Sequence, residues 1–499
     1  MGLLSNPVFA KLEAWGYLWL LSLRGVGFTT NIFMNIALLK FGYGSVGCTP
    51  TGSDIGYNAT MERVQTIEEA DLAGDECQGT LPLVGLPILS GYILLNTIST
   101  TVALLVTPIF GTIVDHSPSR KFHTFATCSV YVLVNAIAIA ASPSNWFVMI
   151  CLALFLQQGA YQFHVACVAA YCTEIADGDE QIIALQNAGR VFELSFMLFF
   201  AALIGVVGKA LGDVVERTAV LGQVIATVYC VPIMFVAYAR IEERPALQAG
   251  EADLCYGFRR LRSTVKELWA TNFYVLQYLV GLAFVNAANM SVIGLTPLYA
   301  MQQLNIENPT GVVGITIVAC IPGALINNSL SKRLGMRRQL GNLISTAAAT
   351  IGVLVAFVHR EGQVLEIYAC GFVCGLVLGG IYPSLKGVYM SIIPAGQEVE
   401  FQGLYSFFAM VLGFLPTTWF GFAVDSSLGG EAGARRVGLV GIIVFYAVGY
   451  FLCSYCLDDK KAKEVAAKTA HLRARGKLMI GSASVVHAVD EGEGGVKSR

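Results

Sequence analysis

The chain has 499 residues, of which 55% are hydrophobic and only 13% are charged, and its mean hydropathy is +0.63. Soluble proteins carry about 25% charged residues, so too few polar side chains exist here to cover a water-facing surface of this size. The net charge of −2 is uninformative, whereas the lack of a basic tract with interleaved aromatic residues before the tail argues against a nucleic-acid partner. The alternative of a large soluble protein with an apolar core is disfavoured, because the apolar residues fall in long runs.

These apolar runs recur along the whole chain, and each is long enough to cross the hydrocarbon as a helix. They predict an all-α membrane protein with twelve transmembrane helices. The first run begins too late and is too long for a cleavable signal peptide, so we expect it to be retained. The expected spans lie near residues 15–39, 83–110, 122–142, 146–171, 187–208, 219–239, 273–300, 311–330, 339–358, 365–392, 403–424 and 436–457.

A long polar loop, about 40–82, follows the first span. It holds the sequon that begins at Asn58 and two cysteines, Cys48 and Cys77. A glycan on Asn58 and a Cys48–Cys77 disulfide would both suit a loop outside the cell or in a lumen. Most other cysteines lie in apolar runs, where cysteine is usually a small hydrophobe.

Lysine and arginine in the short loops set the expected orientation. They gather after spans two, six and eight and in the tail, which places both termini in the cytoplasm. We expect an N-terminal six-helix half at 1–239, a cytoplasmic linker at 240–272, a C-terminal six-helix half at 273–457 and a partly disordered cytoplasmic tail at 458–499. The basic end of the linker, 259–270, could lie flat on the membrane surface or be a solvated linker.

An internal repeat relates the two halves. GTIVDHSPSR after span two matches NSLSKRLGMR after span eight, with an offset of 217 residues at Asp115–Lys332 and Arg120–Arg337. YCTEIADGDE at the end of span four matches YMSIIPAGQE at the end of span ten, with an offset of 218 residues. A near-constant offset across two loops indicates a duplicated six-helix unit.

The loop after span two resembles the signature of the major facilitator superfamily. Its Gly111, Asp115 and Arg120 match a glycine, an acid and a basic end between helices two and three, although Pro118 stands where that family usually has a glycine. The resemblance implies the major facilitator fold and a charge relay that latches the cytoplasmic side. Asp115 could instead simply cap a helix dipole, which would require no transport.

A narrower resemblance covers the late region, about 379–457, and residues 160–180. This region looks like the autophagy-related vacuolar amino-acid effluxers and their bacterial relatives. The matching features are Gly379-Gly380, a basic residue six positions later, Pro394, Gly396, EVEF and GLY. Span one departs from that family and reads LRGVGFTTNIFMN. The resemblance implies a transporter that moves amino acids out of a vacuole-like compartment, in a vacuolar, lysosome-like or plasma membrane. The repeat and the resemblances together predict these gating residues: Gly111, Asp115, Arg120, Lys332, Arg337, Glu174, Lys386, Glu398 and Glu400.

Polar residues deep in the spans are the candidates for solute binding, because polar groups facing lipid are costly. In span one, Arg24, Asn31 and Asn35 share one helical face. Arg24 could hold a carboxylate through two hydrogen bonds, or it could snorkel or form a structural salt bridge. The remaining candidates are Gln157, Gln158, Tyr161 and His164 in span four, Asn286 and Asn289 in span seven, and Tyr382 in span ten.

Each of these candidates also has a simpler interpretation. Gln157 and His164 could join helices by hydrogen bonds without any solute, although His164 could also couple transport to protons. Arg190 and Glu193 are expected to pair near the cytoplasmic end of span five, and Lys386 is expected to snorkel. No acid stands out as a proton carrier, which favours uniport or histidine-linked coupling.

We find no phosphate-binding Gly-Lys-Ser or Gly-Lys-Thr loop, no metal-ligand spacing and no enzymatic constellation, so we expect neither an enzyme nor a cofactor. The sequence predicts a monomeric secondary or facilitative transporter of small organic solutes, amino acids first, surrounded by membrane lipid and working by alternating access. A second possibility is a carrier of another organic anion, a nucleoside or a drug-like solute. A different class is a membrane sensor or scaffold that does not transport.

Overall fold

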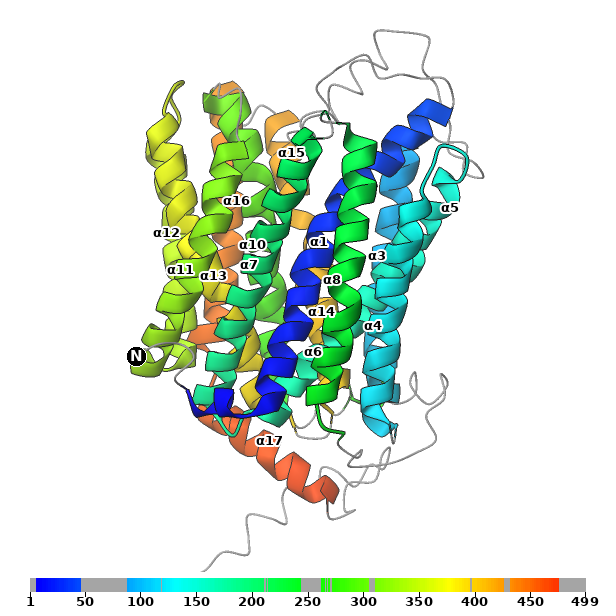
Figure 1. The fold of residues 1–499 in the computed structure, drawn as a ribbon. Coiled ribbons are helices and arrows are strands. Elements are labelled where there is room, and N and C mark those ends of the chain that lie inside the picture. The colour runs from blue at the N-terminus through cyan, green and yellow to red at the C-terminus, as the bar shows by residue number, and fades with distance from the viewer. Residues whose placement is uncertain are drawn as a thin grey trace, which may run out of the picture.

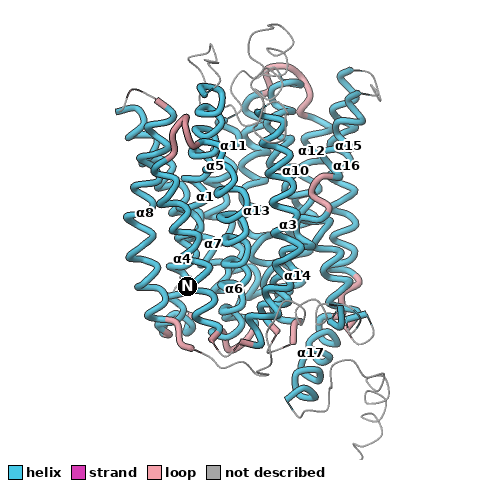
Figure 2. Tube along the Cα trace, turned by 90° about the vertical axis from the view of Figure 1, so that its right-hand side faces the viewer, coloured by secondary structure: helices cyan, strands magenta, loops and turns pink. Residues whose placement is uncertain are grey.

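The computed structural model describes residues 6–45, 88–117, 119–210, 212, 214–243, 262–264, 266, 268–269, 272–304, 310–394, 397–425 and 431–474. Its described residues are helical or in short turns, and the long helices run side by side as one bundle (Figures 1 and 2). The predicted glycan at Asn58, the predicted Cys48–Cys77 disulfide and Gly396 lie outside the described residues.

The helices up to residue 240 are called here the N-terminal set. A short 3-10 helix, η2 (Pro7–Ala10), leads into the long helix α1 (Leu12–Ser45). The expected span four is one continuous rod of an α-helix, a π-helical segment and a second α-helix: α5 (Trp146–Cys151), η4 (Leu152–Gln157) and α6 (Gln158–Ile175). The other members are α3 (Ile88–His116), α4 (Arg120–Ile137), η3 (Ala138–Ala140), α7 (Asp179–Ala210) and α8 (Val215–Arg240).

The helices from residue 273 onward are called the C-terminal set. Its members are α10 (Phe273–Leu304), α11 (Thr310–Leu334), α12 (Met336–Phe357), α13 (Val364–Ile392), α14 (Glu398–Val411), α15 (Leu415–Asp425), α16 (Glu431–Tyr450), η5 (Phe451–Tyr455) and α17 (Asp459–Ala474). The linker residues 262–264 are helical, with Thr264 buried. Residues 459–474 of the tail form a helix, α17, which the sequence analysis did not predict.

Ten helices in the described part of the chain are long and apolar enough to cross a membrane. The twelve expected spans are reached by adding α1 and by counting the pair α14 and α15 as one. The expected single span at 403–424 is in fact broken, because a turn at Leu412–Phe414 separates α14 from α15. The bundle therefore has the expected all-helical architecture, with one span built from two short helices.

Two large apolar clusters form the core. One draws almost all its residues from the N-terminal set, and the other almost all from the C-terminal set. Each contains one residue from the opposite set, Met390 in the first and Ile183 in the second. Ile183 lies near the start of α7, where Asp179 pairs with Lys463 of α17, and Met390 lies near the end of α13, which also contacts α17. Helix α17 lies at the predicted cytoplasmic side of the bundle (Figure 1).

Candidate functional site

The two sets of helices meet at Asp115, near the end of α3. Its carboxylate accepts hydrogen bonds from the backbone N–H groups of Val399, at 3.2 Å, and Glu400, at 2.8 Å. These N–H groups belong to the first turn of α14, where the helix leaves donors unpaired and carries partial positive charge. Asp115 therefore caps a helix, as the simpler interpretation held, but the helix belongs to the opposite set.

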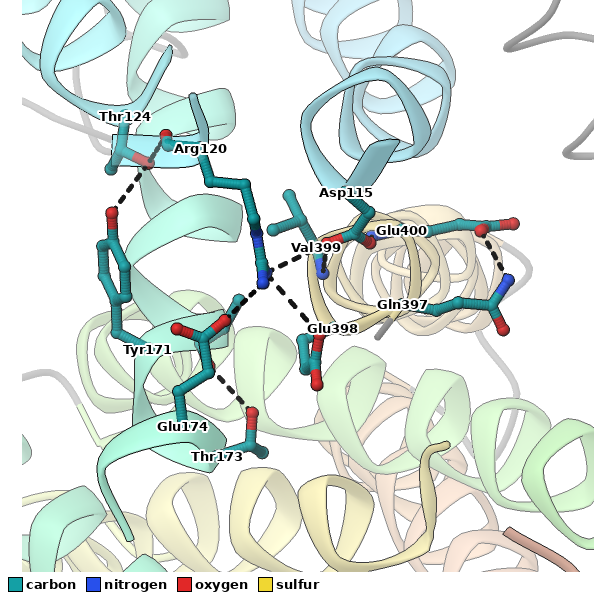
Figure 3. Close-up of polar contacts among 11 residues, drawn as sticks. Asp115, Arg120, Thr124, Tyr171, Thr173, Glu174, Gln397, Glu398, Val399 and Glu400 are labelled. Carbon is teal, nitrogen blue, oxygen red and sulfur yellow. Dashed lines mark hydrogen bonds and ion pairs between the residues drawn. The ribbon is translucent and has the colours of Figure 1, made fainter. Parts of the chain in front are cut away.

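Arg120 gathers three carboxylates around this helix end (Figure 3). Its guanidinium lies 3.0 Å from Asp115, 2.6 Å from Glu174 and 3.6 Å from Glu398. The Asp115 side chain is fully buried and that of Arg120 is only 11% exposed, so water screens these charges weakly. Asp115, Arg120, Glu174 and Glu398 are called the latch below.

Close backbone packing brings the latch together. A side chain on Gly111 of α3 would meet the Val399 carbonyl oxygen at 2.5 Å, and one on Gly403 of α14 would meet the Pro108 backbone at the same distance. Small residues allow membrane helices to approach this closely. Glycine at these two positions is thus a requirement of the α3–α14 contact.

A second junction lies on the same side of the bundle and is related to the latch by the repeat. Lys332, at the end of α11, forms an ion pair of 2.7 Å with Glu180 at the start of α7. Lys332 is the repeat equivalent of Asp115, and Glu180 is the equivalent of Glu398. Lys463 of α17 pairs with Asp179 beside it. Each set therefore holds the first turn of a helix in the other set.

A charged cluster lies deeper in the bundle. The two oxygens of Glu193 on α7 face two arginines, Arg24 of α1 at 3.2 Å and Arg190 at 3.2 Å. Aromatic rings flank the cations, with Tyr161 5.9 Å from Arg24 and Tyr382 of α13 5.1 Å from Arg190. The cluster thus spans α1, α6, α7 and, from the opposite set, α13.

The depth of Arg190 and Glu193 was predicted wrongly, although their pairing is confirmed. Helix α7 begins at Asp179 rather than near 187, because two acidic residues in its first turn favour the helix N-terminus. Glu193 consequently lies close to the middle of a 32-residue helix, about 21 Å from its start at about 1.5 Å per residue. Counting both residues from the true helix start would have placed them well inside the span rather than near its end.

Lys386 joins this cluster rather than the latch. It lies on α13, within electrostatic range of Arg24 and Glu193. Its side chain is half-buried, and its expected role of snorkelling to the interface stays a prediction.

Several other predicted polar residues bond within their own set. The amide of Gln157 donates to Asn31, at 2.9 Å, and to Asn135, at 2.8 Å. Both of its donors are therefore used between helices of the N-terminal set, which is the pattern of helix packing rather than solute binding. In the C-terminal set, Asn289 accepts a hydrogen bond of 2.8 Å from Tyr446.

The remaining candidates differ in their burial. His164 and Asn286 are buried, whereas Asn35 and Gln158 are half-buried. Glu400 is buried beside Thr264 and Gln397, and Arg337 donates to the carbonyl oxygen of Leu457. A junction missed from the sequence joins Asn187 of α7 to Asn327 of α11 at 3.0 Å, with Ser384 of α13 also 3.0 Å from Asn327. A buried amide in a helix gives no sequence signal of its partner.

Solved structures with the same arrangement are major facilitator transporters, and the chain has their fold. They include the fucose:proton symporter FucP of E. coli (TM-score 0.60, 13% identity, covering 89% of this chain and 98% of that one). A bacterial homologue of the iron transporter ferroportin, outward-facing, gives a TM-score of 0.59 at 14% identity, covering 88% and 98%. The human organic anion transporter MFSD10 gives 0.57 at 13% identity, covering 90% and 100%.

Within this fold, the chain belongs to the family described as "Vacuole effluxer Atg22 like", whose model matches residues 184–467. The match includes Arg190, Glu193 and the start of α14, although it leaves out Arg24 and Asp115. No curated protein matches the sequence. The family and the fold are those of transporters rather than of enzymes.

Proposed function

We propose that the protein carries small organic solutes that bear a carboxylate, amino acids first, across a vacuole-like or plasma membrane by alternating access. The observation that carries this proposal is Arg24, which lies within α1 and is shared between Glu193 and the ring of Tyr161. A guanidinium in a membrane is costly unless it is paired, and a paired one can exchange its partner for a solute carboxylate.

The proposed cycle uses the latch as the cytoplasmic gate. In the structure, the described polar bridges between the two sets lie on the predicted cytoplasmic side or at the charged cluster. This distribution supports a state closed toward the cytoplasm and able to open on the opposite side. Solute binding at Arg24 would precede release of the latch, after which the two sets rock about the cluster. Both termini are then cytoplasmic.

The test is flux into liposomes that contain the purified protein. Arg24→Ala is compared with the unchanged protein over a panel of amino acids, carboxylates, nucleosides and uncharged drug-like solutes. We expect carboxylate-bearing solutes to move through the unchanged protein and their flux to fall at least tenfold in the variant. Arg360→Ala removes an exposed arginine and serves as the control. Background flux for every solute would favour a sensor or scaffold, and normal amino-acid flux through Arg24→Ala would contradict the role of Arg24.

A further inference from the structure

The charges of the central cluster do not balance. In the described part of the chain, Glu193 is the carboxylate that forms an ion pair with Arg24 and with Arg190. Two guanidinium groups against one carboxylate leave one excess positive charge. An unbalanced buried charge is costly, so a site of this kind favours an added anion.

The hydrogen-bonding edges of both arginines support the same conclusion. Arg24 reaches Glu193 through one terminal nitrogen and Arg190 reaches it through another. The Nε atoms of both arginines are buried and have no hydrogen-bond partner among the described residues. A guanidinium can hold a carboxylate through Nε together with a terminal nitrogen, so each arginine retains a donor suited to an acid group.

We infer that the cluster formed by Arg24, Arg190 and Glu193 binds a small organic anion with two carboxylates, in preference to a solute with no net charge. The inference rests on the proposed transport function and names its substrate class. A solute with no net charge, such as glutamine, would leave the excess charge in place. A solute with two carboxylates compensates that charge and offers one acid group to each arginine, with Glu193 as the internal counter-ion that it displaces in part.

The location of the cluster gives this binding a mechanical consequence. Arg24 and Glu193 lie in the N-terminal set, whereas Tyr382 and Lys386 lie on α13 of the C-terminal set. Arg190 already contacts the Tyr382 ring across the junction. An anion held by Arg24 and Arg190 would therefore lie where the two sets meet, and its binding would be coupled to how the sets pack.

Glutamate and glutamine provide the sharpest test, because they are nearly isosteric and differ by one charge. Thermal stabilisation of the purified unchanged protein by each ligand measures binding, and liposome flux measures transport. We expect glutamate, and likewise succinate over succinamate, to bind at least tenfold more tightly. Arg190→Gln should remove this preference, Glu193→Gln should tighten glutamate binding, and Arg360→Gln should change neither.

The outcomes separate the inference from the proposed function. Glutamine that binds and moves as well as glutamate, or chloride that stabilises the protein where no organic anion does, would overturn the inference. In the first case, the transport proposal would still stand. Glutamate that binds in preference to glutamine but does not move would support the assigned site and contradict transport. The comparison on the unchanged protein gives an answer even if a variant fails to fold.

Discussion

At the scale of single residues, Asp115 combines two roles that the sequence suggested as alternatives. It faces Arg120 and also accepts from the first turn of α14. Removing one member of a buried ion pair leaves the other charge without compensation, which costs about 3 kcal/mol or more. Exposed ion pairs contribute roughly 0–1 kcal/mol. Burial, rather than the mere presence of an ion pair, therefore determines how much the Asp115–Arg120 pair contributes to stability.

Asp115→Asn tests this difference. The amide oxygen can still accept from Glu400, but the charge opposite Arg120 is lost. We expect a melting temperature several degrees lower in detergent and greater cytoplasmic accessibility of the latch to a thiol reagent, with one cysteine introduced there. Asp177→Asn is the matched control, since Asp177 pairs with Lys11 at an exposed site. Equal melting temperatures for the two variants would show that the latch does not hold the sets together.

The sequence could predict part of this site and not the rest. The loop signature and the repeat identified Asp115, Arg120, Glu174 and Glu398, and the structure brings all four together. The depth of Arg24 indicated the central cluster. Its partners depend on how α1 packs against α7, which no local pattern encodes, and a boundary error at the start of α7 concealed Glu193. Whether the members of this cluster bind solute remains a prediction.

At the scale of elements, the α3–α14 contact depends on glycine at its closest points. Gly111→Ala would place a methyl carbon 2.5 Å from the Val399 carbonyl oxygen, and neither backbone can yield locally. Overpacking of this kind typically costs about 1–3 kcal/mol. The contact carries the latch, so separation of the helices would also lengthen the Asp115 hydrogen bonds.

We expect Gly111→Ala and Gly403→Ala each to lower the melting temperature and to favour a state open to the cytoplasm. A pair of spin labels on the cytoplasmic ends of α3 and α14 would report the increased distance. Gly205→Ala on α7 is the control, because no atom lies within 4 Å of the added carbon. It should be neutral or stabilising by about 0.5–1 kcal/mol, as for glycine in a helix interior. Unchanged label distances in both latch variants would contradict the packing argument.

At the scale of the whole molecule, the predicted cytoplasmic side is joined by the latch, by Lys332–Glu180 and by α17. The buried alanines Ala462 and Ala466 seat α17 on the bundle. Partial burial lowers the pKa of Lys463, but the carboxylates of Asp179 and Asp459 outweigh it and raise that pKa above its ordinary value. The tail helix α17 is thus joined to the N-terminal set by the ion pair between Lys463 and Asp179.

The raised pKa gives the contact a defined pH dependence. A lysine whose pKa rises on folding contributes its stability fully below its unfolded value, about 10.4, and loses it only as the pH passes the raised value. Protection of α17 from limited proteolysis should therefore be constant from pH 6 to pH 9. It should weaken in Lys463→Asp and return in the charge-swapped pair with Asp179→Lys. Loss of protection between pH 6 and pH 9 in the unchanged protein would show that another group holds the helix.

The turn at Leu412–Phe414 divides one membrane span into a part that bears the latch and a part that packs on α16. A continuous helix would transmit every tilt of its cytoplasmic end to its far end. A span divided into two helices allows the cytoplasmic end to move while the opposite end stays closed. We therefore expect a long-lived occluded intermediate in which both ends of the bundle are closed around the solute. In this state, opening of one end is not coupled to opening of the other.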